Sequence, residues 1–250
     1  MEHWVEFPPE PSELTLAWRA PEQFGDRTRW AVGILSNRGS TPSFRYLEGE
    51  EFRSANQGRD IFQLKGMGYR GYPAFESRRS PNGTFTDNVM EAFLRRLPPG
   101  RRSDFPQYLE LYRYRGRALS PMSLLALTAA RLPSDGFSLI DRLDSESAAC
   151  DTIVEIMGFR HHSADTDSLE IGCPLTLQAE PGNPIDADAV RVESNGAMIG
   201  YVDRFQARSV GRWLETRSVS CWLLRKNGKP HVPVAFAFLR MRLREGALAA

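Results

Sequence analysis

Alternating apolar and polar positions in the second half of the chain predict a small, curved antiparallel sheet. Such alternation places the apolar side chains of a strand on one face and the polar ones on the other. The predicted strands are 153–156, 174–178, 189–193, 199–202, 218–224 and 232–240. The last two flank Lys226-Asn227-Gly228-Lys229, which has the composition of a tight hairpin turn. Between the fourth and fifth strands, the apolar spacing over 202–213 predicts a helix.

The first half of the chain mixes strand and helix patterns. We expect a hairpin because two strand-like runs flank Asn37-Arg38-Gly39, and Ser120 is placed to cap a helix. Residues 69–75 are rich in glycine and aromatic residues, which predicts a loop packed by its own rings. The predicted strands are 14–19, 29–35 and 42–47, and the predicted helices are 88–97, 105–112 and 121–132.

These patterns predict an α+β protein with two domains. We expect an extended tail at 1–13, a mixed strand and helix domain at 14–141, a polar, acidic linker at 142–151 and a domain built on the small, curved antiparallel sheet at 152–243. The chain has 250 residues, of which 41% are hydrophobic and 25% charged. This composition is typical of a globular protein and does not indicate disorder.

Three polar motifs stand at the ends of predicted strands in the second domain. They are Gly-Phe-Arg-His-His at 158–162, Glu-Pro-Gly-Asn-Pro-Ile-Asp at 180–186 followed by Ala-Val-Arg-Val at 189–192, and Ile-Gly-Tyr-Val at 199–202. In this order they resemble the HIRAN domain, over roughly residues 151–243. The resemblance implies a small barrel similar to an OB-fold that binds single-stranded DNA, in its best-known members at a free 3′ end.

The resemblance also implies a set of nucleic-acid-binding residues. Such a site needs flat rings for bases, cations for phosphates and a fixed carboxylate for the terminal hydroxyl. Cationic side chains in the first motif and on the predicted helix would contact phosphates, and His161, His162 and Tyr201 would contact bases and sugar. Asp186 would accept a hydrogen bond from the 3′-hydroxyl, and Asn183 would shape its loop. The implied cationic residues are Arg160, Arg204 and Arg208.

Two features of the motifs depart from the family pattern. Other residues of the implied site also have purely structural interpretations. The His161-His162 pair replaces tyrosines often found there, and Ile185 replaces a stacking tyrosine, so stacking is expected to be weaker. Asp186 could instead stabilise its own turn, and the arginine ridge at 204, 208 and 212 could be a solvated helix face. Zinc binding is not expected, since adjacent residues of a strand point to opposite faces and no paired cysteines complete a site.

Residues 31–141 resemble the N-terminal portion of HipA-type toxin kinases, with a less specific match. The pattern is Val-Gly-Ile-Leu-Ser at 32–36, Phe-Leu-Arg-Arg-Leu-Pro-Pro-Gly-Arg-Arg at 93–102 and Ser-Pro-Met-Ser-Leu-Leu-Ala-Leu at 120–127. In that family this portion is a scaffold beside the kinase core and has no catalytic residues.

Charge, cysteines and missing motifs narrow the function classes. The net charge is +1, the cysteines form no CxxC, and the chain lacks a hydrolase elbow, a Walker loop and an HExxH motif. We therefore expect a bacterial, cytoplasmic protein that is not an enzyme, needs no cofactor or metal and contacts no membrane. The predicted function is binding of single-stranded DNA or DNA 3′ ends in repair or related processing. The alternative is a regulatory module, such as a toxin–antitoxin-type partner, whose first domain docks a protein.

Overall fold

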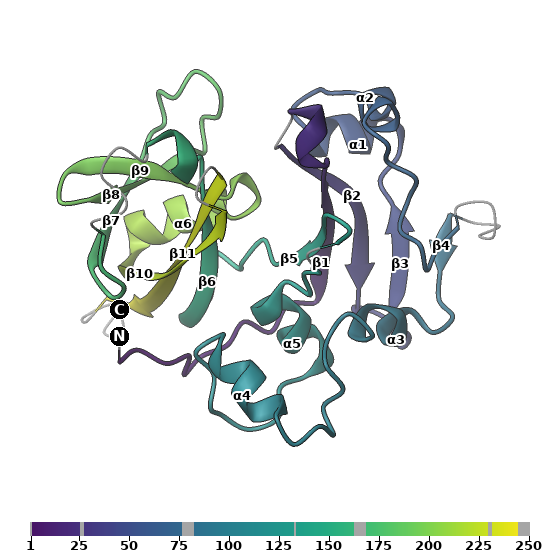
Figure 1. Ribbon diagram of the computed structural model, residues 1–250, viewed down its shortest axis with the longest axis horizontal. Helices are drawn as coiled ribbons and strands as arrows, with labels where there is room; N and C mark the ends of the chain where they lie inside the picture. The colour runs from purple at the N-terminus through teal and green to yellow at the C-terminus, as the bar shows by residue number, and fades with distance from the viewer. Residues whose placement is uncertain are drawn as a thin grey trace. The chain divides into compact units, whose positions relative to one another are not determined.

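The computed structural model describes residues 2–25, 28–76, 83–132, 134–162, 169–229 and 232–244. The fold is α+β, and the chain forms two compact units, each assembled from separate segments (Figure 1). The barrel unit comprises Met1–Pro9, Pro106–Arg117 and Arg142–Ala250, and the sheet unit comprises Glu10–Phe105 and Ala118–Asp141.

The sheet unit contains a five-stranded antiparallel sheet in the order β4-β3-β2-β1-β5. Its strands are β1 (Glu13–Arg19), β2 (Arg29–Ser36), β3 (Ser43–Tyr46), β4 (Thr84–Phe85) and β5 (Phe137–Ile140). Its helices are η1 (Glu22–Phe24), α1 (Gly49–Ala55), α2 (Ile61–Gly66), α3 (Val89–Leu94) and α5 (Pro121–Thr128). The pairing of β2 with β3 confirms the predicted hairpin. Ser120 Oγ accepts a hydrogen bond from Ser123 N at 3.1 Å, which confirms the predicted cap.

Aromatic rings fill the core of the sheet unit. Phe44 lies 4.9 Å from Phe75 between ring centroids, and Tyr72 lies 5.0 Å from Phe93. Tyr46 Oη donates a hydrogen bond to Phe75 O at 2.5 Å, which joins the loop to β3. The loop at 69–75 is therefore packed by its own rings, as predicted.

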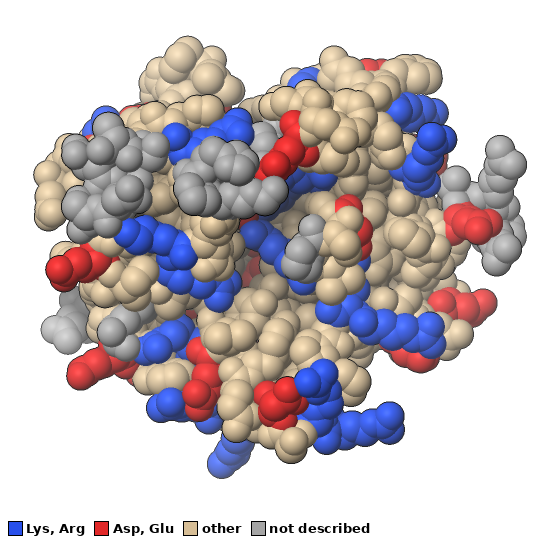
Figure 2. Space-filling model, in the orientation of Figure 1, with Lys and Arg blue, Asp and Glu red and all other residues tan. Residues whose placement is uncertain are grey.

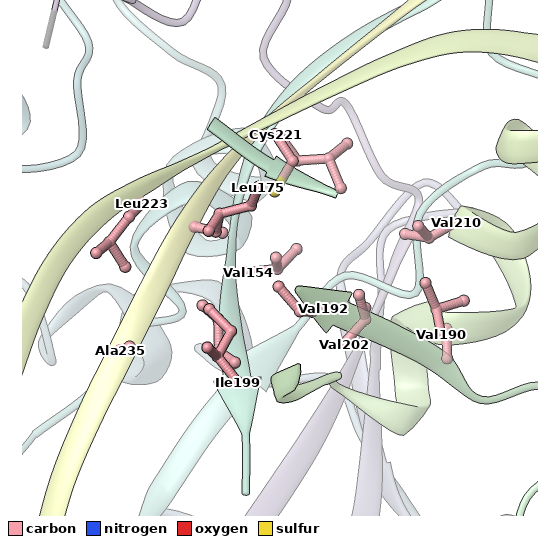
Figure 3. Close-up of a cluster of buried hydrophobic side chains, with 14 of the residues drawn as sticks. Val154, Leu175, Val190, Val192, Ile199, Val202, Val210, Cys221, Leu223 and Ala235 are labelled. Carbon is pink, nitrogen blue, oxygen red and sulfur yellow. The ribbon is translucent and has the colours of Figure 1, made fainter. Parts of the chain in front are cut away.

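The barrel unit is built on a closed six-stranded antiparallel barrel in the order β10-β11-β6-β9-β8-β7. Its strands are β6 (Ala149–Met157), β7 (Pro174–Ala179), β8 (Val190–Ser194), β9 (Ala197–Val202), β10 (Arg217–Lys229) and β11 (Val232–Leu243), and its helices are α4 (Phe105–Glu110), η3 (Phe159–His161) and α6 (Arg204–Thr216). Val154, Val192, Ile199 and Val210 point into one shared interior (Figure 3). Burying these alternate side chains away from water stabilises the closed barrel.

Among the local predictions that differ from the structure are the start of the helix on 202–213 and the turn at 226–229. The helix begins at Arg204 rather than at 202, because Asp203 caps it by accepting a hydrogen bond from Phe205 N at 2.9 Å. The predicted turn at 226–229 is wrong, since Asn227 pairs with Val234 and the strands continue to Lys229 and Val232. The Asn-Gly pair therefore belongs to the long β10–β11 ladder.

The compact units also differ from the predicted domain boundaries. Part of the predicted tail is bound to the barrel: Asp151 N donates a hydrogen bond to Phe7 O at 2.7 Å, and Trp4 lies under the guanidinium group of Arg115 at 3.7 Å. Part of the predicted linker is bound too, since Leu143 is buried in the barrel core and Trp213 Nε1 donates to Asp144 O at 3.1 Å. Neither segment shows a strand pattern, so this packing could not be predicted from local patterns.

Candidate nucleic-acid interface

Strand register places a row of side chains on the outer face of the barrel. Gln178 on β7 pairs with Arg191 on β8. Arg191 in turn pairs with Tyr201 on β9, and Tyr201 pairs with Met157 on β6. Directly paired residues of antiparallel strands project from the same face, and Arg191 Nη2 donates a hydrogen bond to Gln178 Oε1 at 2.6 Å. Tyr201 therefore lies in the middle of a row that crosses four strands.

Gly200 lets β9 lie close against β6 beside this row. Its φ is +144°, and a Cβ atom there would lie 2.4 Å from Met157 O and 2.7 Å from Ile156 Cγ2. A residue with a side chain cannot fit without moving one of the strands. The glycine of the Ile-Gly-Tyr-Val motif thus fixes the position of Tyr201.

Residues 180–189, which we name the Glu180 loop, connect β7 to β8. Glu180 N donates a hydrogen bond to Ala189 O at 2.8 Å, which closes the base of the loop. Asn183 Oδ1 accepts hydrogen bonds from the N–H groups of Ile185 at 3.0 Å and Asp186 at 3.2 Å. Such side-chain bonds to nearby amides fix a turn. Asn183 therefore shapes this loop.

Asp186 uses one carboxylate oxygen within the loop and leaves the other available. Its Oδ1 accepts a hydrogen bond from Asp188 N at 2.9 Å. No described residue donates a hydrogen bond to its Oδ2, and the side chain is half-buried. The carboxylate is therefore held in place by one oxygen and can accept a hydrogen bond from a ligand with the other.

Glu180 joins the loop to the row on the barrel. Its Oε2 accepts hydrogen bonds from Asn183 Nδ2 at 3.0 Å and from Tyr201 Oη at 3.2 Å. Its Oε1 lies 3.3 Å from Arg191 Nε, which also lies 2.9 Å from Glu193 Oε1. Burial, together with the Glu180 carboxylate, raises the pKa of Tyr201. The phenol therefore stays protonated and directs its hydrogen toward Glu180.

Sequence reasoning assigned no role to Glu180 or Arg191. Glu180 had a signal, because it begins the Glu-Pro-Gly-Asn-Pro-Ile-Asp motif three residues before Asn183. Arg191 had none, since its contacts depend on the register of three strands.

The arginine–histidine motif forms a 3-10 turn next to β9. Gly158, with φ +77°, ends β6, and buried Phe159 anchors the turn. Arg160 Nε donates a hydrogen bond to His161 Nε2 at 3.0 Å, His161 is exposed and His162 is half-buried. Residues of η3 contact β9. The expectation that the two histidines alternate across a strand is wrong, because the left-handed glycine ends the strand before them.

The predicted cations on α6 differ in their surroundings. Arg204 is half-buried, and its guanidinium carbon lies 4.3 Å from the centre of the Phe205 ring. Arg208 is exposed, and its Nε lies 2.9 Å from Asp188 Oδ2, which ties α6 to the Glu180 loop. The charge of Arg208 is thus compensated within the protein, which makes it a weaker phosphate contact than its exposure suggests.

Charges of both signs are mixed on the face of the molecule drawn in Figure 2. On the face drawn in Figure 2, the Lys and Arg side chains are interspersed with Asp and Glu, in keeping with the net charge of +1. This face therefore offers no broad surface of uniformly positive charge.

No group of three or more described His, Cys, Asp or Glu side chains could hold a metal ion. The acidic pair Asp165 and Asp167 lies outside the described residues. Cys150, Cys173 and Cys221 are free, and burial raises the pKa of Cys221 to about 12. Across the described ranges no helix is both long and apolar enough to cross a bilayer.

Comparisons with known proteins bear on the barrel only. The family model of the HIRAN domain matches residues 150–239. The crystal structure of the HIRAN domain of human HLTF is 16% identical, with a TM-score of 0.33, over 38% of this chain and 77% of that chain. A crystal structure of a protein from Lactobacillus plantarum is 22% identical, with a TM-score of 0.33, over 38% of this chain and 95% of that chain. No curated protein matches the chain at a significant level.

The family match does not extend to residues 31–141, so the resemblance of that part to HipA-type kinases stays a prediction. It does span all three motifs of the second half, from Gly158 to Val202. The match therefore confirms the predicted resemblance of residues 150–239 to the HIRAN domain.

Proposed function

We propose that the barrel unit binds single-stranded DNA and engages its free 3′ end at the Glu180 loop. The family match supports nucleic-acid binding in general. The observation that carries end recognition is the Asp186 carboxylate, whose Oδ1 is held by Asp188 N while Oδ2 has no donor among the described residues. A terminal hydroxyl can donate a charge-assisted hydrogen bond to this oxygen, whereas a terminal phosphate brings negative charge against it.

The neighbouring residues fit complementary roles in this proposal. Arg160 and Arg204 would contact phosphates, and the exposed imidazole of His161 and the ring of Tyr201 would contact the terminal bases or sugar. Ile185 is 83% exposed at the loop and offers an apolar contact in place of an aromatic ring. In this proposal the chain binds DNA ends during repair or related processing and catalyses no reaction itself.

The variant Asp186→Asn tests end recognition directly. Asparagine keeps an oxygen for the Asp188 amide but loses the charge, so binding of 3′-hydroxyl strands should weaken by about 1.5 to 3 kcal/mol, or roughly 10- to 150-fold in Kd. The gap between 3′-hydroxyl and 3′-phosphate strands should narrow. Fluorescence anisotropy with short 5′-labelled strands of each kind, and with blunt duplex, measures both effects.

Asp188→Asn is the matched control, because it removes the same charge from the same loop and leaves Asp186 intact. Losing a negative charge by itself should strengthen binding to a polyanion, so weaker binding of Asp186→Asn cannot come from charge alone. Melting temperatures of both variants report whether the loop is intact. Equal binding of the two termini by the wild-type protein would remove 3′-end recognition and leave a general single-strand binder.

Salt dependence tests the phosphate contacts. Arg160→Ala and Arg204→Ala should each reduce the slope of log affinity against log salt by about 0.7, the value for one phosphate contact on a single strand. Arg212→Ala is the control, because Arg212 is exposed and its Nη1 lies 2.9 Å from Glu215 Oε2. If the slopes of Arg160→Ala and Arg204→Ala match that of the wild type, neither residue contacts phosphate.

A protein-docking role for the sheet unit is the second candidate function. The observation that favours it is Phe62 on α2, which is 72% exposed, in a unit that also leaves Phe24 40% exposed. Large exposed apolar side chains are a feature of protein interaction surfaces. The same titration separates the two functions, since failure of every DNA to bind would leave docking as the better explanation.

A further inference from the structure

We infer that Glu180 is the positioning residue of the interface, because one carboxylate holds both the loop that carries Asp186 and the phenol of Tyr201. This inference rests on the proposed function and adds a residue that the family resemblance did not assign to it. Glu180 is suited to the role because its side chain is 23% exposed and forms contacts with both of its oxygens.

Glu180 holds the loop through the side-chain amide of Asn183. Asn183 can offer Oδ1 to the amides of Ile185 and Asp186 only while its Nδ2 points the other way. Glu180 Oε2 accepts from that Nδ2 at 3.0 Å and so fixes the orientation of the amide. Glu180 also forms backbone hydrogen bonds at both the base and the middle of the loop, to Ala189 O and from Asn183 N. The position of Asp186 is therefore set through Asn183 by Glu180.

Glu180 also fixes the direction of the Tyr201 hydroxyl group. The hydroxyl hydrogen of Tyr201 is directed at Glu180 Oε2, at 3.2 Å between the oxygens, so toward a ligand the phenol can act only as an acceptor. Asp186 Oδ2 is also an acceptor. The Glu180 loop and Tyr201 thus offer only hydrogen-bond acceptors to a bound strand end. Acceptors suit a terminal hydroxyl, which can donate, and disfavour a terminal phosphate. Glu180 keeps the Tyr201 hydroxyl in this acceptor role without itself contacting the DNA.

Arg191 compensates the negative charge of the Glu180 carboxylate beside the proposed DNA site. Its Nε lies between Glu180 Oε1 at 3.3 Å and Glu193 Oε1 at 2.9 Å, so it offsets part of the negative charge beside the proposed DNA site. Glu193 shares Arg191 with Glu180 and forms no hydrogen bond with the described side chains of Asn183 and Tyr201. The chain therefore contains its own matched control.

The test compares Glu180→Gln with Glu193→Gln, which remove the same charge from the same arginine. Glu180→Gln should weaken binding of a 3′-hydroxyl strand on the order of tenfold, as expected when a pre-organising contact is lost. It should also lower the pKa of Tyr201, followed by NMR of ring-labelled tyrosine with Tyr201→Phe to assign the signal. Hydrogen exchange at the amides of Ile185 and Asp186 should become faster. Glu193→Gln should show none of the three changes.

Circular dichroism and melting of both variants confirm that they are folded. Equal effects of the two substitutions, or unchanged affinity of Glu180→Gln despite altered exchange, would overturn the positioning role. If the wild-type protein binds no strand, the proposed function fails, and exchange together with the Tyr201 titration still shows whether Glu180 holds the loop. The two failures are therefore distinguishable.

Discussion

Gly200→Ala is expected to lower the stability of the barrel unit by roughly 3 to 5 kcal/mol, through backbone strain and overpacking together. The added Cβ would meet the backbone oxygen of Met157 at 2.4 Å, and a carbonyl in a strand ladder cannot swing aside as a flexible side chain can. Relief requires β9 to move away from β6, which would displace Tyr201. Thermal melting should show a decrease in Tm on the order of 10 °C, at about 2–4 °C per kcal/mol for a chain of this size.

Gly196→Ala separates the two causes. Gly196 also has a positive φ, +79°, but a Cβ there would have no heavy atom within 4 Å. Its substitution should cost only the backbone term, about 1 kcal/mol. Similar melting of the two variants would mean that the contact between β9 and β6 is not tight.

Asp151→Asn should have an effect of similar size, because Asp151 joins the N-terminal segment to the barrel. The side chain is fully buried and accepts hydrogen bonds from Glu6 N at 2.8 Å and Phe7 N at 3.2 Å. It also accepts from Arg240 Nε at 3.1 Å and from Arg242 Nη1 at 2.8 Å and Nη2 at 2.9 Å. Removing the charge leaves two arginines without their buried partner, which should cost about 3 to 5 kcal/mol.

The loss of stability caused by Asp151→Asn should depend on pH. Burial alone would raise the pKa of Asp151, but the Arg242 guanidinium and the N–H groups of Glu6 and Phe7 outweigh burial and lower it. A carboxyl group with a lower pKa in the folded state contributes stability that is complete above its unfolded pKa and is lost as the pH falls. The stability difference between wild type and Asp151→Asn should therefore be constant near neutral pH and shrink below about pH 4.

Glu6→Gln is the control, since Glu6 is 59% exposed and lies 3.3 Å from Arg240 and 3.6 Å from Arg242. An exposed pair of this kind should contribute less than about 1 kcal/mol. Chymotrypsin cleavage after Trp4, whose backbone oxygen accepts a hydrogen bond from Arg240 Nη2 at 2.9 Å, gives a second measurement and should become faster in Asp151→Asn. Unchanged melting and cleavage in that variant would show that the N-terminal segment does not depend on Asp151.

The barrel unit is larger than the HIRAN match because two further segments of the chain are bound to it. Asp151 holds the N-terminal segment, and Arg225 holds a second one. Arg225 Nη1 donates a hydrogen bond to Leu111 O at 2.9 Å, which binds a segment from the middle of the chain to β10. Both segments lie outside residues 150–239. Experiments on this barrel are therefore best made with the full chain rather than with the matched residues alone.

Local chemistry in the sequence was enough to find most strands and helices. Alternation along β7 and β8 follows from the geometry of a single strand, and the Ser120 cap follows from the side chain of one residue. The motifs around Arg160, Asn183 and Tyr201 were visible because each lies in a few consecutive residues at the end of a strand.

What only the tertiary structure decided are contacts between residues far apart in the chain. Asp151 binds Glu6 and Phe7 across more than 140 residues, and Glu180 reaches Tyr201 across 21. No local pattern encodes such partners, because they depend on strand register and barrel closure, which are set by the packing of the whole core. The sequence thus determined the elements and the motifs of the interface, whereas its organising residue, Glu180, emerged only when closure of the barrel brought the loop against β9.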